Sequence, residues 1–268
     1  MTRKTALITG STGGIGQAAA ARLDALGYRL VLIDRDPAPL ARQAALYRGA
    51  ETHRLDLTDR TARREFCAGL EARRDIDVAL INAGMIEIGP VTAIAWEAIE
   101  MQMDVNLIAA QQMIQALARA MTARGQGHLI ATVSMGAITA LKGSAAYSAS
   151  KFGLRGFLWA LGDELRGTGV HVTGLYPAGV DTPMLRHEAL EGGSNLNFLG
   201  TPVSADDVAG AMARALIKPR LEVYVPWSES VLGRLSLVFP WMLGPLYPLL
   251  EKIGERGRQA YIARTGIG

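Results

Sequence analysis

The sequence predicts an α/β protein built on a doubly wound parallel sheet. Short strands of uniformly apolar residues alternate with helical patterns from the start of the chain, and a glycine-rich segment follows the first strand. Such continuously apolar strands are typical of parallel sheets that helices cover on both faces. The chain has 268 residues, 49% of them apolar, so it can bury one sizeable core.

The expected elements follow one another in a regular order. Apolar runs predict strands at residues 6–8, 30–33, 78–81, 128–133, 170–175 and 222–226, and helical patterns lie at residues 15–26, 60–73, 96–124 and 147–166. Gly27 ends the first helix, as glycine commonly does. No linker or internal repeat interrupts this order before residue 185. We therefore expect one domain over residues 1–226, followed by a C-terminal extension over residues 227–268.

Two later segments depart from this order. Residues 184–201 are polar and rich in glycine, which indicates a mobile loop or a short helical insertion. Residues 231–250 form an apolar tail, in which three prolines are expected to break a helix. The uncharged part from Leu235 to Leu250 would span only ~24 Å as a helix, short of a ~30 Å bilayer core. Four roles of the tail therefore stay open: a lid over the substrate site, a dimer contact, a patch on a membrane surface, or a segment folded on its own domain.

Composition and charge exclude several classes of function. The net charge is +3, but the arginines are scattered and no basic run is interleaved with aromatic residues, so we expect no nucleic-acid partner. Cys67 is the only cysteine, which excludes a disulfide within the chain. The four histidines lie far apart without metal-ligand spacing, so no metal site is expected. The first residues lead directly into a strand without an apolar leader, which indicates a cytoplasmic protein.

The glycine-rich segment at residues 9–16 indicates a nucleotide site. Gly10, Gly14 and Gly16 lie where the first strand leads into the first helix. Glycines let the backbone turn tightly and approach a pyrophosphate, which then lies at the positive end of the helix. The alternative is a tight strand–helix turn without a ligand.

Asp34, at the end of the second strand, indicates which dinucleotide is bound. An acid at this place can bind both ribose hydroxyls of NAD, and it repels the 2′-phosphate of NADP. Arg35 follows it and could serve that phosphate instead. We expect NAD, with NADP as the alternative.

Tyr147 and Lys151 are four residues apart on a predicted helix, so their side chains lie on the same face. An adjacent cation favours the phenolate and is expected to lower the pKa of the tyrosine from ~10. The pair could then transfer a proton near neutral pH without a histidine. The alternative is an amphipathic helix whose lysine lies along apolar surface with its ammonium in water.

Together with Ser134, these motifs resemble those of the short-chain dehydrogenase/reductase family, whose single-domain members have a Rossmann fold. The resemblance runs from Thr5 to about Pro226. It implies a catalytic tetrad of Asn106, Ser134, Tyr147 and Lys151. It also implies that cofactor-binding residues are Gly10, Ser11, Gly14, Ile15, Gly16, Asp34, Arg35, Asp56, Leu57, Asn82, Ala83, Gly84, Tyr147, Lys151, Pro177, Gly179, Val180 and Thr182. One departure is Ala178, which stands between the family's proline and glycine.

The resemblance also assigns roles to these residues. Tyr147 exchanges a proton with the substrate oxygen, Ser134 donates to the same oxygen, and Lys151 lowers the tyrosine pKa and binds the nicotinamide ribose. Asn106 is implied to hold a water that links Lys151 to solvent. Asp56 and Leu57 contact the adenine ring, and the motif 82–84 steadies the central sheet. Thr182 contacts the nicotinamide carboxamide.

The expected function is hydride transfer between NAD(H) and a secondary alcohol or ketone. Ser134 and Tyr147 would bind the substrate oxygen, and an apolar pocket would take a lipophilic or aromatic substrate. The residues expected to line that pocket are Met184, Leu185, Leu190, Leu196, Phe198 and the tail. The alternatives are an NADP-dependent carbonyl reductase and a nucleotide-sensing binding protein with dormant chemistry. A homo-oligomer, dimer or tetramer, is expected, and a peripheral membrane contact through the tail is a further alternative.

Overall fold

A computed structural model describes residues 3–267 of the chain. Within this part, parallel strands form one seven-stranded sheet in the order β3-β2-β1-β4-β5-β6-β7, which confirms the predicted fold class. The strands are β1 (Thr5–Thr9), β2 (Arg29–Asp34), β3 (Glu51–Arg54), β4 (Ile76–Ile81), β5 (Gly127–Thr132), β6 (Val170–Pro177) and β7 (Glu222–Val225). The chain reverses its direction of winding between β1 and β4, and ligands of such sheets bind at this point.

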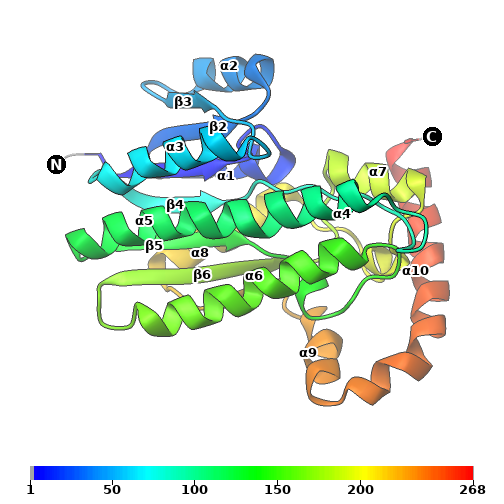
Figure 1. Ribbon diagram of the computed structural model, residues 1–268. Helices are drawn as coiled ribbons and strands as arrows, with labels where there is room; N and C mark the ends of the chain where they lie inside the picture. Colours follow the sequence, from blue (N-terminus) through cyan, green and yellow to red (C-terminus); the bar gives the residue numbers. More distant parts are fainter. Residues whose placement is uncertain (1–2, 268) are drawn as a thin grey trace.

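Helices cover both faces of the sheet (Figure 1). One apolar core lies between the sheet and α3, α5 and α6, and a second lies between the sheet and α1, α2 and α8. These helices are α1 (Gly14–Ala25), α2 (Pro37–Leu46), α3 (Arg60–Ala72), α4 (Trp96–Met103), α5 (Ala110–Arg124), α6 (Ala145–Glu164) and α8 (Ala205–Ile217). The almost completely buried strands β1, β4 and β5 lie at the centre, so the loops at their carboxyl ends are held by a rigid support.

The helix expected at residues 96–124 contains a wide turn. α4 leads without a break into the π-helical turn η1 (Asp104–Ala109), which leads into α5. A π-helical turn accommodates one extra residue and is frequent at functional sites. The apolar pattern could not reveal it, because the residues on either side continue one helix.

The edge strand β3 and the helices α2 and α8 were not predicted. β3 alternates half-buried and exposed positions and consists of polar residues, so it lacks the apolar run used to find the other strands. It is placed by its parallel pairing with β2, from Val31 opposite Glu51 to Asp34 opposite Arg54. Pairing of this kind is a long-range property that a short polar segment does not reveal.

The C-terminal part adds helices outside these layers (Figure 1). Residues 183–199 form α7 (Pro183–Glu191) and a 3-10 turn, η3 (Asn195–Phe198), which agrees with the expected helical insertion. We call residues 183–199 the lid segment. The tail forms α9 (Ser230–Val238), the short turn η4 (Pro240–Met242) and the long α10 (Leu243–Thr265).

The expectation that the tail prolines break a helix was only partly right. Pro240 does follow the end of α9, but Pro245 and Pro248 both lie within α10. Pro245 falls in the first turn of α10, where a backbone N–H would have no partner within the helix. Pro248 lies one turn later and is accommodated inside the helix. Among the described helices, none is both long and apolar enough to cross a bilayer.

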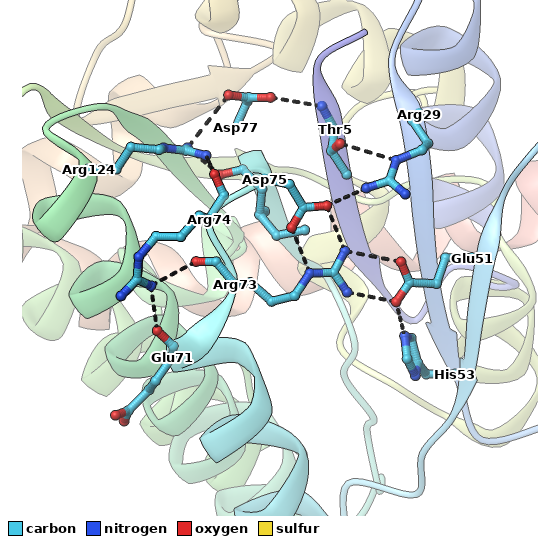
Figure 2. A network of polar contacts seen from close by, with 11 residues as sticks. Thr5, Arg29, Glu51, His53, Glu71, Arg73, Arg74, Asp75, Asp77 and Arg124 are labelled. Atoms are coloured by element: carbon cyan, nitrogen blue, oxygen red, sulfur yellow. Dashed lines mark hydrogen bonds and ion pairs between the residues drawn. The ribbon is translucent and has the colours of Figure 1, made fainter. Parts of the chain in front are cut away.

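A network of ion pairs links the strands at the edge of the sheet opposite the carboxyl ends (Figure 2). Arg73 donates to both carboxylate oxygens of Glu51 (2.7 and 3.0 Å) and of Asp75 (2.7 and 2.9 Å). Hydrogen bonds from Arg73 lower the pKa of both acids. Arg29 pairs with Asp75 from β2. The network ties β2, β3 and β4 together, and we assign it a structural role at the end remote from the site.

Candidate functional site

The loops that follow β1 and β4 pack tightly against each other. The Thr9 hydroxyl oxygen accepts the backbone N–H groups of Asn82 (2.9 Å) and Ala83 (3.1 Å). The Asn82 amide donates to the Gly10 carbonyl (3.1 Å) and accepts the Thr132 hydroxyl (3.0 Å). Gly10 has a φ of +60°, and a Cβ there would lie 2.8 Å from the Ala83 Cα. The predicted motif at 82–84 therefore does steady the centre of the sheet.

The glycine turn brings bare backbone to the N-terminus of α1. A Cβ on Gly16 would lie 2.1 Å from the Gly10 carbonyl oxygen, and one on Gly14 would lie 2.6 Å from the Thr182 Cγ2. Ser11 is buried, and its carbonyl accepts the amide of Gln43 (2.8 Å). Ile15 packs into the core behind the turn. A backbone turn of this kind at a helix N-terminus fits a pyrophosphate.

Asp34 lies beside this turn, as the sequence predicted. One carboxylate oxygen accepts the backbone N–H of Thr12 (3.0 Å), and the other accepts that of Arg35 (2.8 Å). The acid therefore helps to shape the glycine turn. The Arg35 side chain is exposed.

Asp56 and Leu57 follow β3 at the same edge of the sheet. Asp56 accepts the backbone N–H (2.9 Å) and hydroxyl (2.8 Å) of Thr58, and these bonds lower the pKa of its carboxyl group. The cap of α3 is Asp59. The Leu57 carbonyl accepts the buried guanidinium of Arg63.

Ser134, Tyr147 and Lys151 lie together, as their spacing predicted. Tyr147 and Lys151 lie one turn apart on α6, and the Lys151 Nζ is 5.6 Å from the centre of the Tyr147 ring. The Tyr147 side chain lies near Ser134, which follows β5 and lowers the pKa of the phenol. Gly136 fits between them, since a Cβ there would lie 3.3 Å from the Ser134 Oγ and 3.4 Å from the Tyr147 ring. The cluster is a phenol with a hydroxyl and an ammonium beside it.

The expected lowering of the Tyr147 pKa was wrong for the protein alone. Burial raises the pKa of Tyr147 well above its ordinary value, and the nearby Ser134 hydroxyl opposes this rise only in part. Lys151 is buried, which lowers its own pKa from 10.5 to about 8. Its Nζ donates to the Thr132 carbonyl (2.9 Å) instead of to the phenol oxygen. Desolvation therefore outweighs the effect of the neighbouring cation.

Asn106 lies in the wide turn η1 and completes the cluster. Its amide accepts the backbone N–H of Met85 and donates to the Met85 carbonyl, both at 2.8 Å, and it also donates to Ser150 Oγ on α6 (3.3 Å). A Cβ on Gly84 would lie 3.3 Å from the Asn106 Oδ1 and 3.7 Å from the Lys151 Nζ. The glycine thus lets the β4 loop, the amide and the ammonium approach one another. The bound water implied for Asn106 stays a prediction.

The segment after β6 passes in front of the glycine turn. Pro177 ends β6, and the extra residue Ala178 keeps its backbone N–H bonded to the Val225 carbonyl (2.9 Å). Val180 forms a bridge with Val203, and its carbonyl accepts the Thr182 hydroxyl (3.1 Å). The departure from the family pattern therefore leaves the backbone pairing at β7 intact.

The structure places two of the leucines expected to line an apolar pocket in different surroundings. Leu185 is only 3% exposed and packs with Phe198 and Tyr261 beneath the C-terminal helix α10. Leu190 is 51% exposed on the outside of α7. The order of apolar residues in the sequence could not distinguish the side of α7 that packs against α10 from the side that faces the site. Met184 is half-buried, and its contact with substrate stays a prediction.

Glu188 is a buried acid near the candidate site that the sequence reasoning missed. It is 5% exposed, and its carboxylate accepts the Asn197 amide (2.8 Å). Burial raises the pKa of this carboxyl to about 7, and its charge raises the pKa of Tyr147. Glu188 shares one face of α7 with the apolar residues Leu185 and Ala189. This helical spacing was the signal in the sequence that could have indicated a buried acid.

The residues present fit a dinucleotide. Side chains are excluded at Gly10, Gly14 and Gly16, so a phosphate could reach the N–H groups of the turn, and Asp34 supplies acceptors for ribose hydroxyls. The acid/base cluster lies at the adjoining end of β5. These parts occupy the edge of the sheet where such ligands bind in open α/β folds.

Comparison with known proteins agrees with this geometry. The family described as short chain dehydrogenase matches residues 4–191. A 1-deoxy-11-beta-hydroxypentalenate dehydrogenase from Streptomyces exfoliatus is 37% identical over 231 residues, which cover 82% of each chain.

Two solved structures are similar in fold. A short-chain dehydrogenase from Sphingobium yanoikuyae in complex with NADPH has a TM-score of 0.78 and 25% identity over 91% of this chain and 95% of its own. One from Burkholderia phymatum in complex with NAD has a TM-score of 0.79 and 23% identity over 90% and 95% of the two chains, a likeness of fold alone. From its sequence match and its site, the chain belongs to the short-chain dehydrogenase family.

Proposed function

We propose that the protein transfers a hydride between NAD(H) and a secondary alcohol or ketone of lipophilic or aromatic character. The observation that carries this proposal is the grouping of Tyr147, Ser134 and Lys151 beside the glycine turn. The name of the Streptomyces exfoliatus relative, a dehydrogenase of a hydroxypentalenate, supports an alcohol as one form of the substrate.

In this proposal the nicotinamide supplies or accepts the hydride. Because burial keeps Tyr147 protonated, the phenol can donate its proton to a ketone oxygen as the hydride arrives. The Ser134 hydroxyl donates to the same oxygen and stabilises its developing charge. Lys151 holds a cation behind the phenol, and Asn106 supports a proton path to solvent.

We propose NAD as the preferred cofactor, because the carboxylate of Asp34 would repel a 2′-phosphate. The two cofactors can be compared by measuring kcat/KM for NADH and for NADPH in the reduction of the same panel of ketones. The expected result is a preference for NAD of at least about tenfold, equivalent to ~1.4 kcal/mol. A preference for NADP would favour the NADP-dependent carbonyl reductase instead.

The same measurements test a binding protein with dormant chemistry. Tight NADH binding with no turnover on a broad panel of alcohols and ketones would support that alternative. The grouping of Ser134, Tyr147 and Lys151 argues against the binding-protein alternative, because a protein that only senses a nucleotide needs no acid/base pair.

We also propose a homo-oligomer. A groove of about 1200 Å³ follows the outer faces of α5 and α6, which Figure 1 shows uncovered by another layer. Ile108 is exposed there, and Phe157 and Leu165 are only partly buried. These apolar side chains lie among arginines and glutamines of α3 and α5, and a second copy could cover this mixed face.

The tail supports a further proposal, a contact with a lipid surface. Trp241, Val238 and Leu249 are 74%, 68% and 56% exposed along the segment that runs from α9 through η4 into α10. Aromatic and aliphatic side chains exposed together on an uncharged segment are typical of interfacial helices.

Sedimentation velocity with and without vesicles tests the proposed lipid contact and assembly. We expect the protein to sediment with vesicles that contain anionic lipid, and we expect W241S to bind them at least about threefold more weakly. I217S is the matched control, because Ile217 is exposed on α8 away from the tail. Equal binding by both variants, or none by the wild type, would contradict the lipid contact, and the sedimentation coefficient without vesicles reports the oligomer.

A further inference from the structure

Helix α10 meets the lid segment backbone to backbone. Gly254 and Gly257 lie three residues apart on one face of α10. A Cβ on Gly254 would lie 2.1 Å from the Asn195 carbonyl oxygen, and one on Gly257 would lie 2.0 Å from that of Phe198. Both oxygens belong to η3. A helix can approach another segment this closely only where it carries no side chain.

Tyr261 continues the same face of α10, four residues after Gly257. Its ring packs on Phe198 with the ring centres 5.4 Å apart, and it is 2% exposed. Its hydroxyl donates to the Asp181 carboxylate (2.6 Å), which also accepts the Arg186 guanidinium (3.0 Å). These two bonds lower the pKa of Asp181, so the carboxylate is charged at neutral pH and its hydrogen bonds are strong.

Asp181 immediately precedes Thr182, which lies against Gly14 of the glycine turn. The Asp181 backbone N–H bonds the Val203 carbonyl (2.9 Å). The side chain and the backbone of Asp181 are therefore held from two directions, by α10 and by the strand-like segment at Val203. Movement of Tyr261 would be transmitted to the residue beside Thr182.

The other end of α10 is attached to the loop that follows Ser134. The Tyr247 hydroxyl accepts the backbone N–H of Lys142 (2.9 Å), and Glu251 pairs with the Lys142 ammonium (3.8 Å). α10 therefore bridges two parts of the site, the loop on the Ser134 side and the lid segment on the Thr182 side.

We propose that α10 is a positioning element, which sets the lid segment and Asp181 so that Thr182 faces the nicotinamide. Gly254, Gly257 and Tyr261 are its positioning residues. The part of this inference that concerns nicotinamide rests on the proposed function, whereas the coupling of α10 to the lid does not.

The test compares G257A and Y261F with G244A in the full chain. Gly244 lies on the same helix, and among the described residues nothing is within 4 Å of a Cβ placed there. Amide hydrogen exchange of residues 183–199 measures the lid, and quenching of NADH fluorescence measures the dissociation constant. We expect G257A to speed exchange of these amides at least about tenfold and Y261F to raise the NADH dissociation constant about three- to tenfold, with G244A unchanged.

The two readouts separate the possible failures. If G257A and G244A gave the same exchange in residues 183–199, α10 would not position the lid. If Y261F bound NADH like the wild type, Asp181 would not transmit the effect to Thr182. If the wild type bound no NADH while G257A still loosened the lid, the proposed function would fail and the structural coupling would stand. General unfolding of G257A would appear as faster exchange in β1 and β4 too, and Y261F then decides the matter.

Discussion

Replacing Tyr147 with phenylalanine is expected to reduce kcat at least about a thousandfold while NADH binding stays nearly unchanged. The substitution removes one oxygen and keeps the ring in its packed position on α6. In the proposed mechanism, that oxygen carries the proton that is exchanged with substrate. Steady-state turnover and NADH fluorescence measure the two effects separately.

Y28F provides a matched control for this experiment. It removes the same phenol oxygen from a tyrosine that packs against the opposite core, near the start of β2. Turnover close to the wild-type value in Y147F would overturn the assignment of Tyr147 as the proton donor. Loss of NADH binding in Y147F would show instead that the phenol mainly shapes the cofactor site.

Replacing Gly16 with alanine is expected to destabilise the protein by about 3 kcal/mol or more and to weaken NADH binding at least about a hundredfold. The new Cβ would lie 2.1 Å from the Gly10 carbonyl oxygen and 2.8 Å from the Ser11 Cα, so the turn itself would have to open. Neither contact is with a flexible side chain that could move aside. Urea unfolding and NADH titration measure the two losses.

G13A is the control for the stability part of this result. A Cβ on Gly13 would lie 3.4 Å from the same Gly10 oxygen, an ordinary contact, and its φ of −72° suits alanine. We expect its free energy of unfolding to lie within about 0.5 kcal/mol of the wild type. If G16A were as stable as G13A, the close packing of the turn would not be what requires glycine at position 16.

The sequence could predict the features that depend on spacing along the chain. The pairing of Tyr147 with Lys151 follows from helix geometry, and the position of Asp34 follows from the end of an apolar strand. In each case, a local pattern and one rule of the fold are sufficient.

Features that depend on burial and on distant contacts could not be predicted. The reversed pKa shift of Tyr147 arises from desolvation, and no spacing reveals how deeply a side chain lies. The bond from Tyr261 to Asp181 joins residues 80 positions apart. Leu185 was expected in an open pocket because an apolar residue looks the same to the sequence whether it meets a ligand or another helix.

The wide turn at residues 104–109 could be lost in evolution without loss of the fold. Deleting one residue there would close the turn into an ordinary α-helix, and α4 and α5 would remain one rod with the same buried face. The fold would survive, but Asn106 would be rotated away from Met85 and Ser150. A single lost codon could thus remove the contacts that join the β4 loop to α6 through Asn106, without altering Tyr147 or Lys151.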